Sequence, residues 1–192
     1  MAETQYTPDP QHPFASTLGR PKVSAIRLKD DGEIPNNVLP LLLYQGAFDR
    51  SALRRDSAAL IQEVFRANDW GHSWVNGVFS FHHYHSMAHE VLGCFDGSAT
   101  VQFGGPGGVT QAVTAGDVVV IPAGVGHKNC GASGDFGVVG AYPPGQHSDM
   151  LYGKPGERPR ADENIEGVPL PQSDPIFGSE GPLLQHWFSG RS

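Results

Sequence analysis

The chain has 192 residues, of which 39% are hydrophobic and 17% charged, a composition typical of one globular domain with a core of its own. A formal net charge of −7 leaves no basic footprint, which excludes nucleic acid and anionic membranes as partners. No segment approaches the roughly 20 apolar residues of a membrane span, and two cysteines are too few for a disulfide framework, so we expect a cytoplasmic protein.

The part of the chain before Trp70 is predicted to flank the main β-structure. Residues 1–22 contain four prolines, so we expect an extended N-terminal arm that is able to lie on a partner subunit. Strands are predicted at residues 23–29 and 39–48. The run from Leu41 to Tyr44 is apolar on both faces, which favours a strand covered on two sides, at a subunit contact. Apolar residues at helical spacing between Ser51 and Asp69 predict one helix, which packs against a sheet and carries no chemistry.

From Trp70 onwards, short apolar runs alternate with glycine-rich turns. No helical crossover interrupts these runs, so an all-β sandwich or barrel is predicted and a parallel α/β fold is excluded. After Tyr142 the chain is rich in proline and glycine, and we expect residues 146–192 to form an extended C-terminal arm whose aromatic end docks on the barrel or on a partner. The predicted strands cover residues 77–85, 89–96, 98–104, 109–114, 117–121, 126–131 and 135–142.

Residues 82–90 gather four histidines and a glutamate. Because side chains alternate along a strand, His83 and His85 share one face and can converge on an ion, to which Glu90 adds an oxygen. Imidazole nitrogen with one carboxylate suits Zn, Fe, Mn or Ni better than Ca or Mg. The alternative is a row of exposed histidines along a polar edge strand. His82 and His89 have the opposite parity and are expected to point outward.

Two groups of residues at fixed spacing resemble the two signature motifs of the cupin superfamily. The first group is Gly77, His83, His85, Glu90 and Gly97, and the second is Gly116, Pro122, Gly124 and His127. The resemblance is to a single-domain bacterial cupin of uncharacterised function. It implies a double-stranded β-helix, the jelly-roll barrel, with one N-terminal helix and Pro/Gly-rich arms.

In this interpretation residues 1–192 form a single cupin domain. It comprises an arm over 1–22, flanking strands and helix over 23–70, a barrel core over 71–145 and an arm over 146–192. The resemblance also implies that His127 completes the metal site with His83, His85 and Glu90, and that the protein is a homodimer. One departure is Asn129, which stands two residues after His127 where cupins often place an asparagine four residues after it.

Three imidazoles and one carboxylate leave open coordination positions for a substrate, water or dioxygen. Cupins with this pattern include dioxygenases, decarboxylases, isomerases and lyases, and also storage and sensor domains. We therefore favour a metal-dependent enzyme that acts on a small organic molecule by Lewis-acid or oxygen chemistry. The alternative is a non-catalytic protein that binds a metal or small ligand. The spacing fixes no acid or base, and Asp96, Asn129 and Tyr142 are the candidates.

Overall fold

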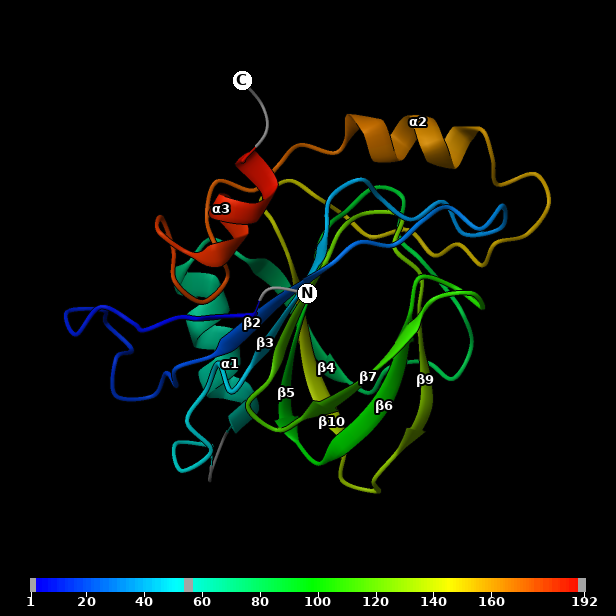
Figure 1. The fold of residues 1–192 in the computed structure, drawn as a ribbon. Coiled ribbons are helices and arrows are strands. Elements are labelled where there is room, and N and C mark those ends of the chain that lie inside the picture. Colours follow the sequence, from blue (N-terminus) through cyan, green and yellow to red (C-terminus); the bar gives the residue numbers. More distant parts are fainter. Residues whose placement is uncertain (1–2, 54–56, 190–192) are drawn as a thin grey trace.

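The computed structural model describes residues 3–53 and 57–189 and contains two antiparallel β-sheets (Figure 1). The larger sheet has the strand order β1-β2-β3-β8-β5-β10-β4, and the smaller has the order β7-β6-β9. The two sheets face each other as a jelly roll, which confirms the predicted all-β class. The strands are β1 (Glu3–Gln5), β2 (Lys22–Ile26), β3 (Leu41–Gln45), β4 (Gly71–Asn76), β5 (Glu90–Asp96), β6 (Ser98–Phe103), β7 (Val109–Thr114), β8 (Val118–Ile121), β9 (His127–Ala132) and β10 (Gly137–Tyr142).

The central strands of the larger sheet are buried on both faces. Leu41 and Leu43 of β3 belong to the apolar cluster between the two sheets, whereas Leu42 and Tyr44 belong to the cluster on the opposite face. Figure 1 shows that the helices α1 (Ser57–Ala67) and α3 (Pro182–Phe188) cover that opposite face. The apolar run is therefore covered on two sides, as predicted, but by its own chain. The predicted subunit contact at this run is wrong, because these side chains are at most 1% exposed.

The predicted helix is present but shorter than expected. Helix α1 spans Ser57–Ala67, and residues 54–56 of the predicted range lie outside the described residues. Its buried side chains include Ile61 and Phe65, which lie over Gly93 of β5. A Cβ at Gly93 would be 2.7 Å from Cγ2 of Ile61, so this glycine allows the helix to pack closely on the sheet. The predicted structural role of the helix is confirmed.

The strand predicted at residues 77–85 is wrong. The regular strand in this region, β4, ends at Asn76, and a loop follows it as far as β5. Two isolated bridges fasten this loop, one between His83 and His127 and one between Tyr84 and Leu151. The loop leaves β4 of the larger sheet and is bridged to β9 of the smaller sheet and to the segment after β10, so it continues neither sheet. Extended backbone is retained only around His83 and Tyr84.

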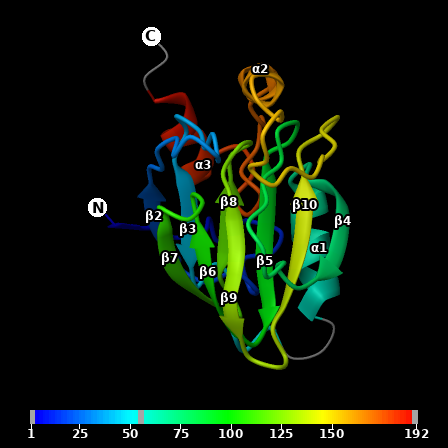
Figure 2. The same cartoon turned by 90° about the vertical axis from the view of Figure 1, so that its right-hand side faces the viewer.

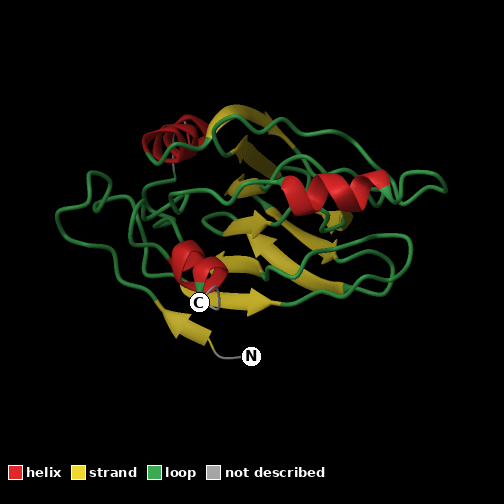
Figure 3. Cartoon of the chain, turned by 90° about the horizontal axis from the view of Figure 1, so that it is seen from above, coloured by secondary structure: helices red, strands yellow, loops and turns green. Residues whose placement is uncertain are grey.

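Both terminal segments pack on the barrel of their own chain. In the N-terminal arm, β1 pairs with β2 and Leu18 is buried. The C-terminal segment is not simply extended, because it contains α2 (Arg160–Gly167) and α3 (Pro182–Phe188). Figure 3, viewed from above, shows α2 lying across one end of the sheets. The predicted docking of the aromatic end is confirmed for Trp187, whose buried indole N–H donates to the carbonyl of Pro40 over 2.9 Å.

Among the described helices, none has the length and apolar character needed to cross a membrane.

Candidate metal centre

Three histidines and one glutamate converge at one end of the barrel, and we call His83, His85, Glu90 and His127 the four-residue cluster. The first two come from the loop after β4, whereas Glu90 begins β5 and His127 begins β9. One ring nitrogen from each histidine lies within 4.8 Å of the other two. The Oε2 atom of Glu90 lies 3.4 Å from Nε2 of both His85 and His127. All four side chains are buried, so both sheets and one loop combine to enclose the cluster.

The turn before His127 is fixed by backbone contacts to the other segments. The amide of Gly124 donates to the carbonyl of His85 over 2.8 Å, and its carbonyl accepts from the amide of Asn36. Gly124 has a φ of +85°, and a Cβ at this position would be 2.6 Å from the carbonyl oxygen of Asn36. Only glycine fits this backbone without strain. Gly124 of the second motif therefore joins the segments that carry His85 and His127.

Each histidine of the cluster directs its Nδ1 atom at a backbone carbonyl. The partners are Phe81 for His83 at 3.2 Å, Val125 for His127 at 3.3 Å, and Asp149 for His85. A carbonyl oxygen can only accept, so each Nδ1 carries a proton and donates it. In the neutral ring, Nε2 then keeps its lone pair, which is the arrangement of a metal-binding histidine with an oriented second nitrogen.

Glu90 is 1% exposed, and neither of its carboxylate oxygens has a hydrogen-bond partner. Burial alone raises the pKa of this carboxyl, but His85 and His127 outweigh burial and lower the pKa to about 2. Burial opposes protonation of His85, but Glu90 outweighs it and raises the pKa of His85 to about 9. Burial lowers the pKa of His127 to about 3. At neutral pH Glu90 is therefore ionised and His85 carries the balancing proton, which a bound metal ion would replace.

The donor set of the cluster fits a divalent transition metal. A buried carboxylate with no donor is costly unless a cation compensates it. Three imidazole nitrogens and one carboxylate oxygen suit Zn, Fe, Mn or Ni, whereas Ca and Mg prefer oxygen ligands. The residues present therefore match the metal that the sequence predicts, and they do not select one metal among the four.

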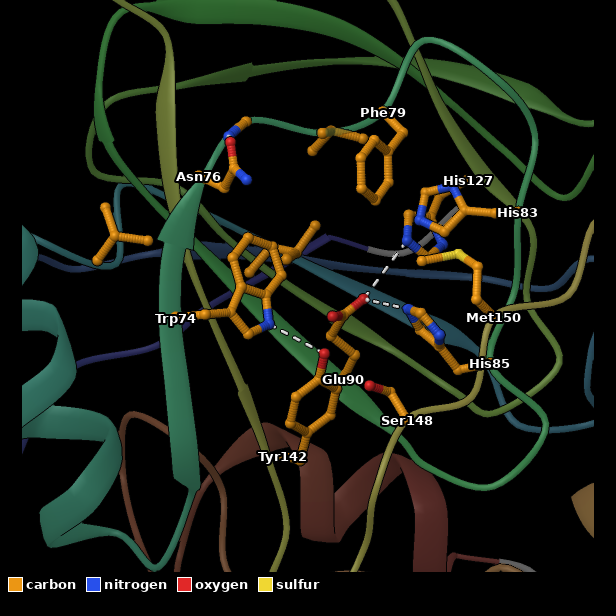
Figure 4. A pocket seen from close by; sticks show the side chains of 14 residues that line it. Trp74, Asn76, Phe79, His83, His85, Glu90, His127, Tyr142, Ser148 and Met150 are labelled. Carbon is orange, nitrogen blue, oxygen red and sulfur yellow. Dashed lines mark hydrogen bonds and ion pairs between the residues drawn. The ribbon is translucent and has the colours of Figure 1, made fainter.

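A cavity of about 230 Å³ opens beside the cluster (Figure 4). Trp74, Phe79 and Met150 form much of its wall, and the hydroxyls of Tyr142 and Ser148 are among its polar groups. The indole N–H of Trp74 donates to the hydroxyl of Tyr142 over 2.9 Å. Burial raises the pKa of Tyr142 to about 12, so its hydroxyl keeps its proton at neutral pH. Figure 4 shows this hydroxyl on the same side of the cavity as Glu90.

The other predicted histidine positions have mixed outcomes. The prediction that His89 points outward is wrong, because its side chain is 1% exposed. Its Nδ1 accepts from the amide of Ala123 over 3.0 Å, and its ring lies 4.8 Å from that of Trp187. Residues 86–89 form a loop, so strand parity does not carry through to this position. His82 is half-buried and does not join the histidine group.

Of the three candidate acid or base residues, only Tyr142 lines the cavity. Asp96 ends β5 and is exposed, at the opposite end of the strand from Glu90. The side chain of Asn129 accepts from the amide of Gly131 over 2.8 Å and so closes a turn. Phe79 and Phe81 lie beside His83, with ring centroids 5.3 and 5.7 Å from its own.

The sequence interpretation missed several residues of the cavity wall, among them Trp74, Ser148 and Met150. They come from β4 and from the segment after β10, which lie on either side of the barrel core in sequence. The only available signal was local, because Trp74 stands just before Gly77, the first residue of the first motif. No spacing rule links it to residues 148 and 150.

Comparison with known proteins identifies one family and one relative that aligns with most of the chain. The sequence model of the cupin family matches residues 75–139. The chain is 45% identical over 159 residues to the uncharacterised protein YjlB of Bacillus subtilis (strain 168), and the alignment covers 82% of this chain and 92% of YjlB.

Several solved structures are similar to this chain at low sequence identity. The dTDP-6-deoxy-D-glucose-3,5-epimerase RmlC of Legionella pneumophila is 13% identical with a TM-score of 0.36, and the match covers 65% of this chain and 73% of that one. A double-stranded β-helix protein of Klebsiella pneumoniae is 16% identical with a TM-score of 0.33, covering 77% and 87%. Procruciferin of Brassica napus is 16% identical with a TM-score of 0.34, and the match covers 75% of this chain but 28% of procruciferin. These likenesses concern the fold alone.

Proposed function

Because this chain belongs to the cupin superfamily, we propose that its four-residue cluster holds a divalent transition metal and that the protein is a metal-dependent enzyme acting on a small organic molecule. The observation that carries the proposal is the buried carboxylate of Glu90, which has no hydrogen-bond donor and faces the Nε2 atoms of His85 and His127. Such a group needs a cation, and the adjoining cavity gives a small molecule access to it.

The residues around the site have separable roles in this proposal. A bound metal would supply Lewis acidity, or a site for dioxygen, at its open coordination positions. The three backbone carbonyls hold the imidazoles in the ligating tautomer. Trp74 and the other apolar wall residues keep water away from the site.

Tyr142 is the candidate proton donor. Its hydroxyl accepts the indole N–H of Trp74, which leaves its own proton free to point at Glu90 or at an oxygen of a bound molecule. Because its pKa is raised to about 12, it acts as a hydrogen-bond donor and not as a base at neutral pH. This role accounts for a polar group in an otherwise mostly apolar cavity.

The alternative is a non-catalytic protein that stores or senses a metal or small ligand. That alternative is favoured by a cavity that is closed or lined by apolar groups alone. The cavity here reaches the surface, where its lining residues Phe79 and Met150 are 45% and 37% exposed, and it presents the hydroxyls of Tyr142 and Ser148, which favours the enzyme.

We also propose that the protein is located in the cytoplasm and forms a homodimer. The thiols of Cys94 and Cys130 are both free, which fits a reducing compartment. The homodimer rests on resemblance to other cupins, and sedimentation of the purified protein at micromolar concentration tests it.

The metal content of protein purified without added metal tests the shared premise. We expect close to one transition-metal ion per chain in the wild type and a large loss in His83→Ala. His147→Ala is the matched control, because His147 is exposed and contacts His72 away from the cluster. Equal metal content in wild type and His83→Ala would refute the site.

Incubating the metal-loaded protein with a small-molecule extract separates enzyme from binder. Mass spectrometry that shows a compound consumed beyond one equivalent per site, by the wild type and not by His83→Ala, supports catalysis. Depletion that stops at one equivalent supports a binding protein.

A further inference from the structure

The wall of the metal-site cavity lacks cationic side chains. Among the residues that the structure describes, those lining the cavity include no lysine or arginine, and its charged groups belong to the four-residue cluster. Lys154 lies outside the lining, with its Nζ 4.6 Å above the ring of Tyr152. An anionic group on a substrate, if remote from the metal, would lose its hydration without gaining a cationic partner. The part of the substrate that contacts this wall therefore carries no anionic group.

Trp74 forms one flat side of the cavity and is held there by two contacts. It pairs with Gly140 of β10, and its indole lies where any Cβ at Gly140 would collide with it. The indole N–H also donates to the hydroxyl of Tyr142. The indole is therefore fixed in both position and tilt, and it presents one aromatic face to the cavity, as Figure 4 shows.

A second aromatic surface lies between Trp74 and the histidines. Phe79 stacks on Phe81, with centroids 4.9 Å apart at 17°, and meets the ring of His83 edge-on at 5.3 Å. Figure 4 shows Phe79 and Trp74 on the same side of the site. Phe79 is 45% exposed, so a bound molecule would cover apolar surface that water otherwise contacts.

We propose that this cavity binds a single-ring, planar molecule, with an oxygen donor directed at the metal and no anionic group elsewhere on the ring. This inference rests on the proposed function, because it assumes an ion at the four-residue cluster. The volume of about 230 Å³ is below the range of about 300–1,000 Å³ for drug-sized ligands, which limits the substrate to one ring with small substituents. Trp74 and Phe79 are the residues that select for the ring.

Four hydroxamates with the same metal-binding group test this inference on the Zn²⁺-loaded protein by calorimetry. Acetohydroxamate lacks a ring, and benzohydroxamate adds one. The 4-carbamoyl and 4-carboxylate derivatives of benzohydroxamate have nearly the same size and differ in charge. We expect benzohydroxamate to bind about tenfold or more tightly than acetohydroxamate, because it covers aromatic surface. We expect the carboxylate to bind about tenfold or more weakly than the carbamoyl compound.

Two variants test whether Trp74 in the cavity wall causes the preference for a ring. Trp74→Ala is expected to lose about tenfold in benzohydroxamate affinity with little change for acetohydroxamate, and Trp74→Phe is expected to recover most of the loss. Metal content is measured in every sample. Metal-loaded protein that binds none of the four probes, or that prefers the carboxylate or the ringless probe, overturns the inference. Protein that takes up no Zn²⁺ refutes the proposed function instead.

Discussion

Two buried carboxylates in this molecule have opposite surroundings. Asp174, in the C-terminal segment, is 0% exposed and accepts from the hydroxyl of Tyr44 over 2.6 Å and from the amides of Ile176, Phe177 and Leu183 over 2.8–3.0 Å. Glu90 is 1% exposed and has no donor at either oxygen. Burial raises the pKa of both carboxyls, but hydrogen bonds oppose it at Asp174 and histidines oppose it at Glu90.

The difference separates a structural carboxylate, Asp174, from the carboxylate that we propose as a metal ligand, Glu90. Asp174 fastens the C-terminal segment to β3 and uses its lone pairs for that purpose. Glu90 keeps its lone pairs unused, beside imidazoles whose Nδ1 atoms are already held by carbonyls. A fold does not leave a buried carboxylate without partners unless something else satisfies it. We therefore expect mutations of the two residues to have different consequences.

The largest expected effect on folding is that of Asp174→Ala. It leaves the hydroxyl of Tyr44 and three backbone amides without their acceptor, and we expect the free energy of unfolding to fall by about 3–5 kcal/mol. Chemical denaturation measures this loss. The control Asp30→Ala removes a more exposed carboxylate paired with Arg158 and should cost less than about 1 kcal/mol. Equal losses in the two variants would contradict the structural role of Asp174.

Glu90→Gln should show the reverse pattern, namely a large effect on metal binding and a small effect on folding stability. We expect metal affinity to fall by about 10–100-fold, because a charged oxygen ligand becomes a neutral amide. We expect the metal-free protein to change in unfolding free energy by less than about 1–2 kcal/mol, because no hydrogen bond of Glu90 is lost and His85, without the charge that raises its pKa, can release its proton. Metal titration and denaturation measure the two quantities. Glu63→Gln, at an exposed position on α1, is the matched control. Unchanged metal affinity in Glu90→Gln would remove this residue from the ligand set.

His89 adds a third case to the comparison. It is a buried titratable residue, but it is neither a hydrogen-bonded structural carboxylate like Asp174 nor a member of the four-residue cluster. Burial lowers its pKa to about 3, below the value of about 6.5 for the unfolded chain. As the pH falls below 6.5 the unfolded state therefore takes up a proton first, and the folded state loses about 1.4 kcal/mol per pH unit from this residue. His89→Gln keeps an acceptor for the amide of Ala123 and cannot titrate.

We therefore expect His89→Gln to show a weaker loss of stability than the wild type between pH 6.5 and 5. Its metal content should match that of the wild type. Denaturation at each pH in the metal-loaded proteins measures the difference. Parallel stability curves for the two proteins would show that His89 is not held neutral by the fold, and lost metal would show that it supports the cluster.

The sequence predicted the convergence of the cluster because its members occur at fixed places relative to strand ends. Glu90 begins β5 and His127 begins β9, and the turn at Gly124 requires a conformation that glycine favours. Such constraints are local and can be recognised from spacing. Alternation failed for His89, because the four residues before Glu90 form a loop whose direction depends on contacts with Gln146 and Asp149.

Other features depend on contacts between distant segments. The cavity wall pairs Trp74 with Tyr142 and Gly140, and no periodicity links these positions. Helix α3 is seven residues long and begins at Pro182, so it has too few turns to show a clear helical period. The run from Leu41 to Tyr44 indicated burial on two sides, but sequence cannot tell whether the cover is the same chain or another.

An anomalous diffraction map tests the central claim most directly. Crystals of protein purified without added metal would be measured at energies above and below the absorption edge of the metal found by elemental analysis. We predict one strong peak per chain, about 2.0–2.3 Å from Nε2 of His83, His85 and His127 and from a carboxylate oxygen of Glu90. A cluster with no peak, or a peak bound by other residues, would contradict the account.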